Sequence, residues 1–185
     1  MGMKVILVSP GQTDWSAQER LQGVLDIPLN AEGEAAVEKL AASLGTEGVK
    51  TVYCPTSLDG RQTATIIGRM TKAKVCARKE LNEADPGLWQ GLTAEELKRR
   101  HPHVYSRWIK SPASVHPPHG EEFTMIFGRV KMILAELRRH KKDEVVVCVV
   151  PSDIRRVLAS LLAGKEIEAT EDLTGGDGGP EVVEL

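Results

Sequence analysis

The chain opens on an apolar run that ends in a turn, Val5-Ile6-Leu7-Val8-Ser9-Pro10-Gly11-Gln12-Thr13. Four consecutive apolar residues without a charge are typical of a strand that is buried on both faces, and Ser-Pro-Gly predicts a sharp turn. Such strands occur in parallel sheets covered by helices on both sides. Ligands of these sheets bind beyond the carboxyl ends of the strands, so we expect any functional site to lie around residues 9–13.

Apolar strands and helices alternate along the rest of the chain. The patterns predict further strands at residues 50–54, around Val75 and at 144–150, and helices at 31–44, 61–70, 94–100, 121–140 and 154–162. We read residues 14–30 as a long loop with one helical turn, and residues 102–120 as a loop or lid. This order predicts one α/β domain over residues 1–185, a three-layer sandwich with a mostly parallel sheet and helices on both faces. We expect residues 165–185 to form a mobile tail, with Val182 and Val183 as a candidate edge strand.

Composition narrows the classes of function. The 185 residues carry a net charge of −2, which gives no electrostatic reason to expect binding to nucleic acid or to a membrane. Cys54, Cys76 and Cys148 are widely spaced and form no metal-binding pattern, which favours reduced thiols and a cytoplasmic protein. We expect no cofactor and no metal. The partner is a small molecule or a protein that the sequence does not identify, and a homodimer is left open.

Six short motifs then share an order and spacing with a known family: Gly11-Gln12-Thr13, Arg20-Leu21-Gln22-Gly23, Asp26-Ile27-Pro28-Leu29-Asn30, Arg61-Gln62-Thr63-Ala64, Leu81-Asn82-Glu83 and Gly87-Leu88-Trp89-Gln90-Gly91-Leu92. In this set the chain resembles the histidine phosphatase superfamily, in its phosphoglycerate mutase-like branch. The resemblance covers about residues 3–163 and implies the same three-layer fold.

The resemblance also implies a chemistry that this chain has altered. In the family a histidine attacks phosphorus, two arginines and a second histidine hold the phosphoryl oxygens, and a carboxylic acid protonates the leaving oxygen. The two arginine positions correspond here to Ser9 and Asp59, and the two histidine positions to Pro10 and Pro151. Proline can neither attack nor donate, and a carboxylate repels phosphate. The general-acid position alone matches, as Glu83.

Three interpretations follow from these residues. Because both histidines and both arginines are replaced, our main interpretation is a catalytically inactive relative, a pseudophosphatase that acts by binding a ligand or a protein. The alternative is an active phosphomonoester hydrolase or mutase that uses other residues. A third is metal-assisted hydrolysis by Asp59, Glu83 and Asp153.

The resemblance and the predicted strand ends together place a set of candidate residues around one pocket. His119 is among them because it falls beside a segment near the family's pocket mouth, although an exposed loop histidine is the simpler interpretation. Since carboxylates replace basic groups, we expect this pocket to disfavour phosphate and to prefer a cationic or neutral polar group. The candidates are Gly11, Gln12, Thr13, Gln22, Asp59, Glu83, His119, Ser152 and Asp153.

Overall fold

Five strands form one sheet in the computed structural model, which describes residues 2–110, 114–164 and 179–184. The strand order is β3-β2-β4-β1-β5, and β1, β2, β3 and β4 run parallel while β5 pairs antiparallel with β1. The expectation of a mostly parallel sheet is confirmed, and the late strand β4 lies between β1 and β2. The strands are β1 (Lys4–Val8), β2 (Val49–Cys54), β3 (Lys74–Ala77), β4 (Val145–Val149) and β5 (Glu181–Glu184).

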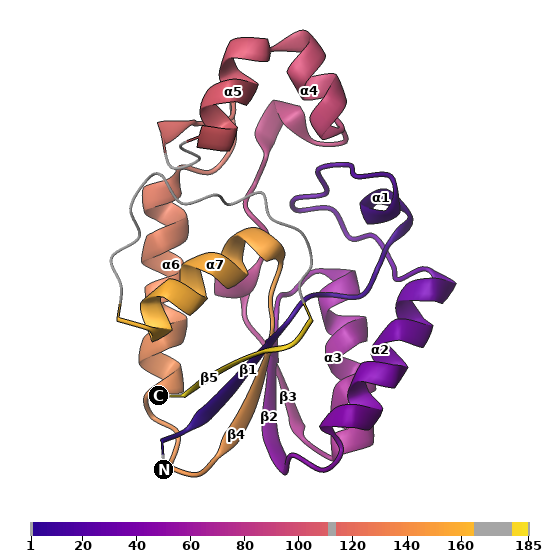
Figure 1. Cartoon of the computed structure of the whole chain (residues 1–185), viewed down its shortest axis with the longest axis vertical. Coiled ribbons are helices and arrows are strands. Elements are labelled where there is room, and N and C mark those ends of the chain that lie inside the picture. The colour runs from indigo at the N-terminus through magenta and orange to yellow at the C-terminus, as the bar shows by residue number, and fades with distance from the viewer. Residues whose placement is uncertain (1, 111–113, 165–178, 185) are drawn as a thin grey trace.

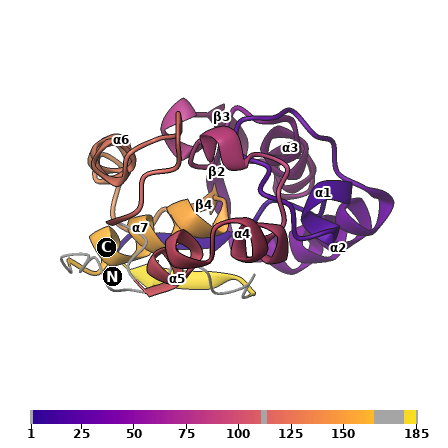
Figure 2. The ribbon, with the colours of Figure 1, turned by 90° about the horizontal axis from the view of Figure 1, so that it is seen from above.

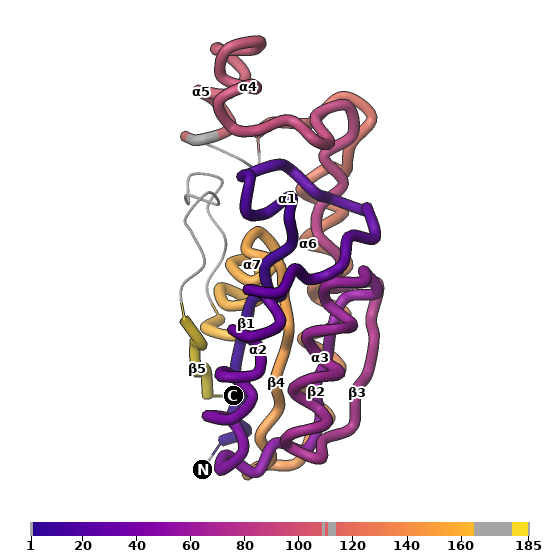
Figure 3. Tube along the Cα trace, turned by 90° about the vertical axis from the view of Figure 1, so that its right-hand side faces the viewer, coloured from indigo at the N-terminus to yellow at the C-terminus, as the bar shows by residue number. Residues whose placement is uncertain are grey.

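Helices cover both faces of this sheet, which confirms the three-layer α/β sandwich (Figures 1 and 2). Helices α6 and α7 pack on one face, and α2 and α3 pack on the other. The remaining helices and two short 3-10 turns lie beyond the carboxyl ends of the strands, where α4 and α5 form a projecting cap (Figure 3). The helices are α1 (Asp14–Ala17), α2 (Ala31–Leu44), α3 (Leu58–Thr71), α4 (Ala94–Arg100), α5 (Pro102–Lys110), α6 (Phe123–Leu137) and α7 (Ser152–Leu162), with η1 (Lys79–Leu81) and η2 (Gly87–Trp89).

Both faces of the opening strand are buried, which explains why its apolar run is uninterrupted. Val5 and Leu7 pack into the core beneath α6 and α7, whereas Ile6 and Val8 pack into the core beneath α2 and α3. All four side chains are at most 2% exposed. Burial of one such side chain contributes about 1.5–3 kcal/mol, so both faces of β1 help to hold the layers together.

Two predicted helices have the expected bounds because their caps are local. The side chain of Asn30 accepts a hydrogen bond from the Gly33 N–H at the start of α2. At the start of α4, Thr93 and Glu96 each accept a hydrogen bond from the other's backbone N–H. These capping bonds satisfy N–H groups that have no partner within the helix.

Helix α3 begins at Leu58, three residues earlier than predicted. Its early start is supported from a distant loop, where the carboxylate of Asp26 accepts a hydrogen bond from the Leu58 N–H at 2.8 Å. As a result Asp59 lies in the first turn of a helix and not in a loop. Helix α7 likewise begins two residues early, at Ser152.

The prediction of an irregular segment at 102–120 is wrong for its first half, which forms α5. Pro102 stands at the first helical position, where its missing N–H costs nothing, and Tyr105 and Trp108 pack toward Trp89. Helix α6 is shorter than predicted, spanning Phe123–Leu137.

Part of the predicted mobile tail is a strand. Glu181–Glu184 forms β5, in which Val183 pairs with Val5 and Val182 with Ile6, so an edge strand forms where Val182 and Val183 suggested one. Residues 165–178 and 185, the rest of that prediction, lie outside the described residues. Within the described ranges, no helix is both long and apolar enough to cross a membrane.

Candidate functional site

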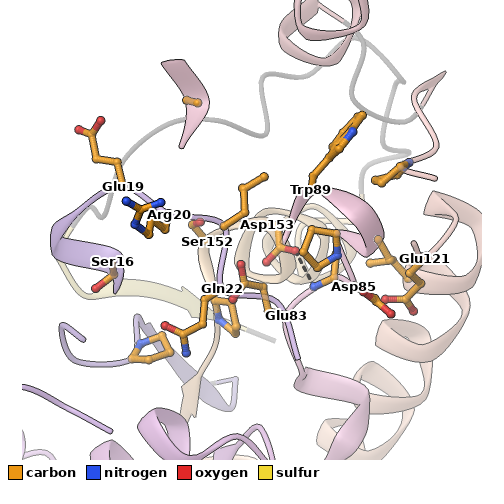
Figure 4. Close-up of a pocket in the computed structure, with 18 of the residues that line it drawn as sticks. Ser16, Glu19, Arg20, Gln22, Glu83, Asp85, Trp89, Glu121, Ser152 and Asp153 are labelled. Carbon is orange, nitrogen blue, oxygen red and sulfur yellow. Dashed lines mark hydrogen bonds between the residues drawn. The ribbon is translucent and has the colours of Figure 1, made fainter. Parts of the chain in front are cut away.

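A cavity of about 690 Å³ opens at the carboxyl edge of the sheet, below the cap formed by α4 and α5. Its wall takes residues from the loop after β1, the first turns of α3 and α7, the loop after η1, and α5 and α6. Glu83, Asp153 and Gln22 converge at its centre, Glu19 and Arg20 lie to one side, and Trp89 lies above (Figure 4). This is the edge at which the opening motif predicted a site.

Most of the candidate residues meet in this cavity. Its lining includes both prolines at the strand ends and eight of the nine ligand candidates, namely Pro10, Pro151, Gly11, Gln12, Thr13, Gln22, Asp59, Glu83, Ser152 and Asp153. They converge because β1 and β4 are adjacent in the sheet, with the Val150 N–H donating to the Val8 carbonyl at 2.8 Å. Residues far apart in the sequence therefore reach one pocket.

One candidate, His119, does not line the pocket, and neither does Ser9, which stands at an arginine position of the family. His119 is exposed on its loop, with a backbone φ of +61°, so its expected place at the pocket is wrong. The backbone around it is fixed by loop contacts and not by the pocket, since the Gly120 N–H donates to the Pro117 carbonyl at 2.9 Å. Ser9 is also outside the lining, with its Oγ buried below the end of β1.

Asp59 is the most enclosed carboxylate of the pocket, with 8% of the residue exposed. It stands in the first turn of α3, where the positive end of the helix dipole favours a negative charge. Within the described parts of the chain, its buried Oδ1 has no hydrogen-bond donor in range. Its backbone carbonyl accepts from Thr63, whose Oγ1 in turn accepts from the Gly11 N–H at 2.9 Å, so α3 and the opening loop are joined.

Glu83 and Asp153 form an interacting pair of carboxyl groups. Burial raises the pKa of Glu83 well above its usual value, and the negative charges of Asp153 and Asp59 raise it further. Burial also raises the pKa of Asp153, but its oxygens accept hydrogen bonds from the N–H groups of Ala84 at 2.9 Å and Ile154 at 2.8 Å. Such bonds stabilise the ionised form, and Asp153 accepts these two whereas Glu83 accepts one, from Gly23. We therefore assign the proton to Glu83 and the negative charge to Asp153.

Several residues of the matching motifs hold the pocket wall together. Thr13 donates to the Gln22 side chain at 2.9 Å, and Gln90 donates to the Gln22 carbonyl at 3.0 Å. Arg20 donates to the Gly91 carbonyl at 2.7 Å, and the Leu29 N–H donates to the side chain of Gln62 at 2.8 Å. These hydrogen bonds fix the loops that form the pocket wall, which gives the motif residues a structural role.

The outer part of the pocket is aromatic, and sequence reasoning missed it. Trp89, Tyr105, Trp108 and Phe123 all belong to the lining, and the Trp89 and Trp108 ring centroids are 6.1 Å apart. The signal was present in the spacing of Val104, Tyr105 and Trp108, which is the spacing of one helix face. Reading this segment as a loop concealed that face.

Acidic groups outnumber basic ones in the pocket. Among the described residues that line it, Arg20 is the one basic side chain, against Glu19, Asp59, Glu83, Asp85, Glu121 and Asp153. Glu121 is neutralised by Arg129, which donates to its two oxygens at 2.7 and 3.0 Å. No three His, Cys, Asp or Glu side chains of the described ranges are arranged to hold a metal ion, so this geometry gives the metal-assisted alternative no support.

The family model of the histidine phosphatase superfamily (branch 1) matches residues 5–184. The chain belongs to the histidine phosphatase superfamily. Its membership confirms the resemblance that the six motifs indicated.

Curated relatives of this family member are named as phosphatases and mutases. Phosphoserine phosphatase 1 of Hydrogenobacter thermophilus is 28% identical over 89% of the chain and 78% of the relative. Phosphoglycerate mutase-like protein 4 of Arabidopsis thaliana is 28% identical over 84% of the chain and 69% of the relative. Among solved structures, a mycobacterial glucosyl-3-phosphoglycerate phosphatase has a TM-score of 0.85 at 24% identity, covering 97% of the chain and 90% of that structure, a likeness of fold.

These relatives correct our main interpretation of the sequence. Proteins named as phosphatases match this chain along most of their length, which contradicts the interpretation of a catalytically inactive protein and favours the alternative of an active hydrolase. The error came from equating the loss of one set of side chains with the loss of activity. Glu83 and its carboxyl neighbours remain in the pocket as groups that can transfer protons.

Proposed function

We propose that this protein hydrolyses phosphate monoesters without a phosphohistidine intermediate. The observation that carries the proposal is that Glu83 and Asp153 line the same pocket of the histidine phosphatase fold, where burial raises the pKa of Glu83 and backbone N–H groups bind the oxygens of Asp153. The phosphatase names of the relatives support the same reaction class. A carboxyl pair of this kind can give a proton at one atom and take one at another.

Hydrolysis of a phosphate monoester does not require a nucleophilic side chain. The transition state of phosphoryl transfer is loose, so positioning and charge stabilisation dominate. In the proposed reaction water attacks phosphorus, its proton passes to Asp153, and the bond to the leaving oxygen breaks as Glu83 protonates that oxygen. The products are an alcohol and inorganic phosphate, and transfer of the proton from Asp153 back to Glu83 restores the enzyme.

The pocket's charge sets the form of substrate that can react. A doubly charged phosphate is repelled by ionised Asp59 and Asp153, whereas a singly charged one is repelled less. A doubly charged phosphate monoester takes up one proton near a pKa of about 6 and becomes singly charged. We therefore expect hydrolysis to be faster below about pH 6 than at neutral pH, until Asp153 is also protonated.

Phosphate release from a panel of monoesters tests the proposal. The panel includes phosphoserine and glucosyl-3-phosphoglycerate, which the relatives' names suggest. In Glu83→Gln we expect kcat/KM to fall by about 10²-fold or more, the usual contribution of a general acid. Glu38→Gln, which removes an exposed carboxylate on α2, is the matched control and should behave as wild type.

Two results would contradict the proposal. Wild-type protein that releases phosphate no faster than Glu83→Gln from every ester would exclude Glu83 as the acid. An acid-labile phosphoenzyme found by mass spectrometry would show that a protein nucleophile, and not water, attacks phosphorus.

We also propose a cytoplasmic location, supported by the three free cysteines. Burial raises the pKa of Cys54 to about 11, and burial also raises the pKa of Cys148. Both thiols are therefore packing groups and not reactive ones.

A further inference from the structure

The aromatic residues of this chain are concentrated in the pocket. The sequence holds only three tryptophans, two tyrosines and two phenylalanines, and four of these seven rings line this cavity. Trp108 lies between two of them, with its ring centroid 6.1 Å from that of Trp89 and 6.2 Å from that of Tyr105. Adjacent rings at these separations present both faces and edges to the space they enclose.

A buried carboxyl group with an unpartnered oxygen lines the same cavity. Asp59 is more than nine-tenths buried and lines the pocket, and no hydrogen-bond donor of the described residues reaches its Oδ1. A carboxylate in this position is costly unless a positive group pairs with it. Asp153 lies nearby, since the charges of Asp153 and Asp59 both raise the pKa of Glu83.

The basic residues nearby are already engaged. Arg129 is held by both oxygens of Glu121 and by the Glu80 carbonyl. Arg20 donates to the Gly91 carbonyl and lies 3.6 Å from Glu96. Arg20 and Arg129 are thus paired with other groups, which leaves Oδ1 of Asp59 as an acceptor that a cationic ligand could reach.

The combination of rings and carboxylates selects the kind of cation. The arrangement of the described carboxylates is not one that holds a metal ion. Aromatic faces bind organic ammonium groups, and quaternary ones in particular, because those cations are large and easily desolvated. A cavity of about 690 Å³ has room for such a group together with a phosphoester.

We infer that this pocket binds a quaternary or methylated ammonium group, with Asp59 as its counter-ion and the rings of Trp89, Tyr105 and Trp108 as its wall. The substrates are then phosphate monoesters of amino alcohols. The ester half of this statement depends on the proposed function, whereas the binding of the cation does not.

Binding of choline tests the cation site without any hydrolysis. Its control is 3,3-dimethylbutan-1-ol, which has the same shape but carries carbon in place of the charged nitrogen. By calorimetry we expect choline to bind about tenfold or more tightly than this alcohol. The preference should be lost in Asp59→Asn, weakened in Trp108→Leu and kept in Glu38→Gln. Equal binding of the two compounds by wild-type protein, or binding of neither, would overturn the inference.

Hydrolysis of two esters separates this inference from the proposed function. We expect phosphocholine to have a kcat/KM about tenfold or more above that of 3,3-dimethylbutyl phosphate. If choline binds selectively but neither ester releases phosphate, the cation site stands and the hydrolase proposal fails. If both esters are cleaved at the same rate and choline does not bind, the hydrolase proposal stands and the cation site fails.

Discussion

The Oδ2 atom of Asp153 accepts a hydrogen bond from the backbone N–H of Ala84 at 2.9 Å. This single bond connects the first turn of α7 to the loop that carries Glu83. Asp153 also accepts from the Ile154 N–H, so one carboxylate contacts the first turn of α7 and anchors a loop. The position of the proposed general acid thus depends on a residue that is 70 positions away from it in the sequence.

Replacing Asp153 should separate its structural role from its charge. Asp153→Ala leaves the Ala84 N–H without its acceptor, and we expect the free energy of unfolding to fall by about 1–3 kcal/mol. Asp153→Asn keeps a carbonyl oxygen that can accept one of the two bonds, so it should lose less. Urea unfolding at neutral pH measures both variants. Equal losses in the two would show that the bond to Ala84 contributes little.

Glu83 should make stability depend on pH in a defined direction. Its pKa is raised in the folded state by burial and by Asp153, so the folded state binds this proton more tightly than the unfolded state does. The stability that the proton contributes is fully present below the unfolded pKa of about 4.3 and is lost as pH rises through the folded pKa. In Glu83→Gln this loss is absent.

Urea unfolding between about pH 4 and pH 8 therefore distinguishes the two proteins. Near pH 4 we expect Glu83→Gln to resemble wild type, because glutamine has the shape of a protonated carboxyl. Near pH 8 the variant should be the more stable. A constant difference across the pH range would show that Glu83 has an ordinary pKa. Glu38→Gln, far from the pocket, controls for the loss of one carboxylate.

Much of the fold follows from local signals, and the sequence contains them. Val5–Val8 is apolar on every residue because both faces of β1 are covered, and Asn30 and Thr93 cap helices within their own segments. Helix α3 starts early for a reason that no local pattern contains, since the acceptor for its first turn is Asp26, 32 residues before Leu58.

The sequence likewise predicted one part of the candidate site and missed another. Motif order placed Glu83 and Asp59 correctly in one pocket, because strand ends meet at one edge of a parallel sheet. The aromatic wall was missed because Tyr105 and Trp108 become pocket residues only when α5 folds over Trp89. The sequence also could not predict the raised pKa of Glu83, because it depends on burial of the side chain and on the charge of Asp153.

The ion pair of Arg78 and Glu136 should stabilise the fold near neutral pH. Arg78 donates to the two carboxylate oxygens at 2.9 and 2.6 Å, and Tyr53 donates to one of them at 3.1 Å. Because both side chains are about one-third exposed, we expect Glu136→Ala to cost only about 1–2 kcal/mol. The hydrogen bond from Arg78 lowers the pKa of Glu136, so this stability is fully present above the unfolded pKa and is lost as pH falls through the lower, folded pKa.

The control for this prediction is the exposed pair of Arg69 and Glu38, whose closest atoms are 3.5 Å apart. Glu38→Ala should change the free energy of unfolding by less than about 0.5 kcal/mol, as expected for an isolated surface pair. Chemical unfolding of both variants gives the comparison. Equal effects would mean that the contacts of Glu136 with Arg78 and Tyr53 add nothing to an ordinary surface charge.

Two glycines inside helices should respond to alanine with opposite signs. A Cβ at Gly33 in α2 would lie 2.2 Å from the Gln12 carbonyl oxygen and 2.7 Å from the Gln12 nitrogen. We expect Gly33→Ala to destabilise the fold by about 1–3 kcal/mol and to weaken ligand binding, because Gln12 belongs to the pocket wall. A Cβ at Gly128 in α6 meets no described atom within 4 Å, so Gly128→Ala should stabilise the fold by about 0.5–1 kcal/mol. Thermal unfolding with and without choline measures both effects, and a Gly33→Ala variant as stable as wild type would show that the opening loop moves freely against α2.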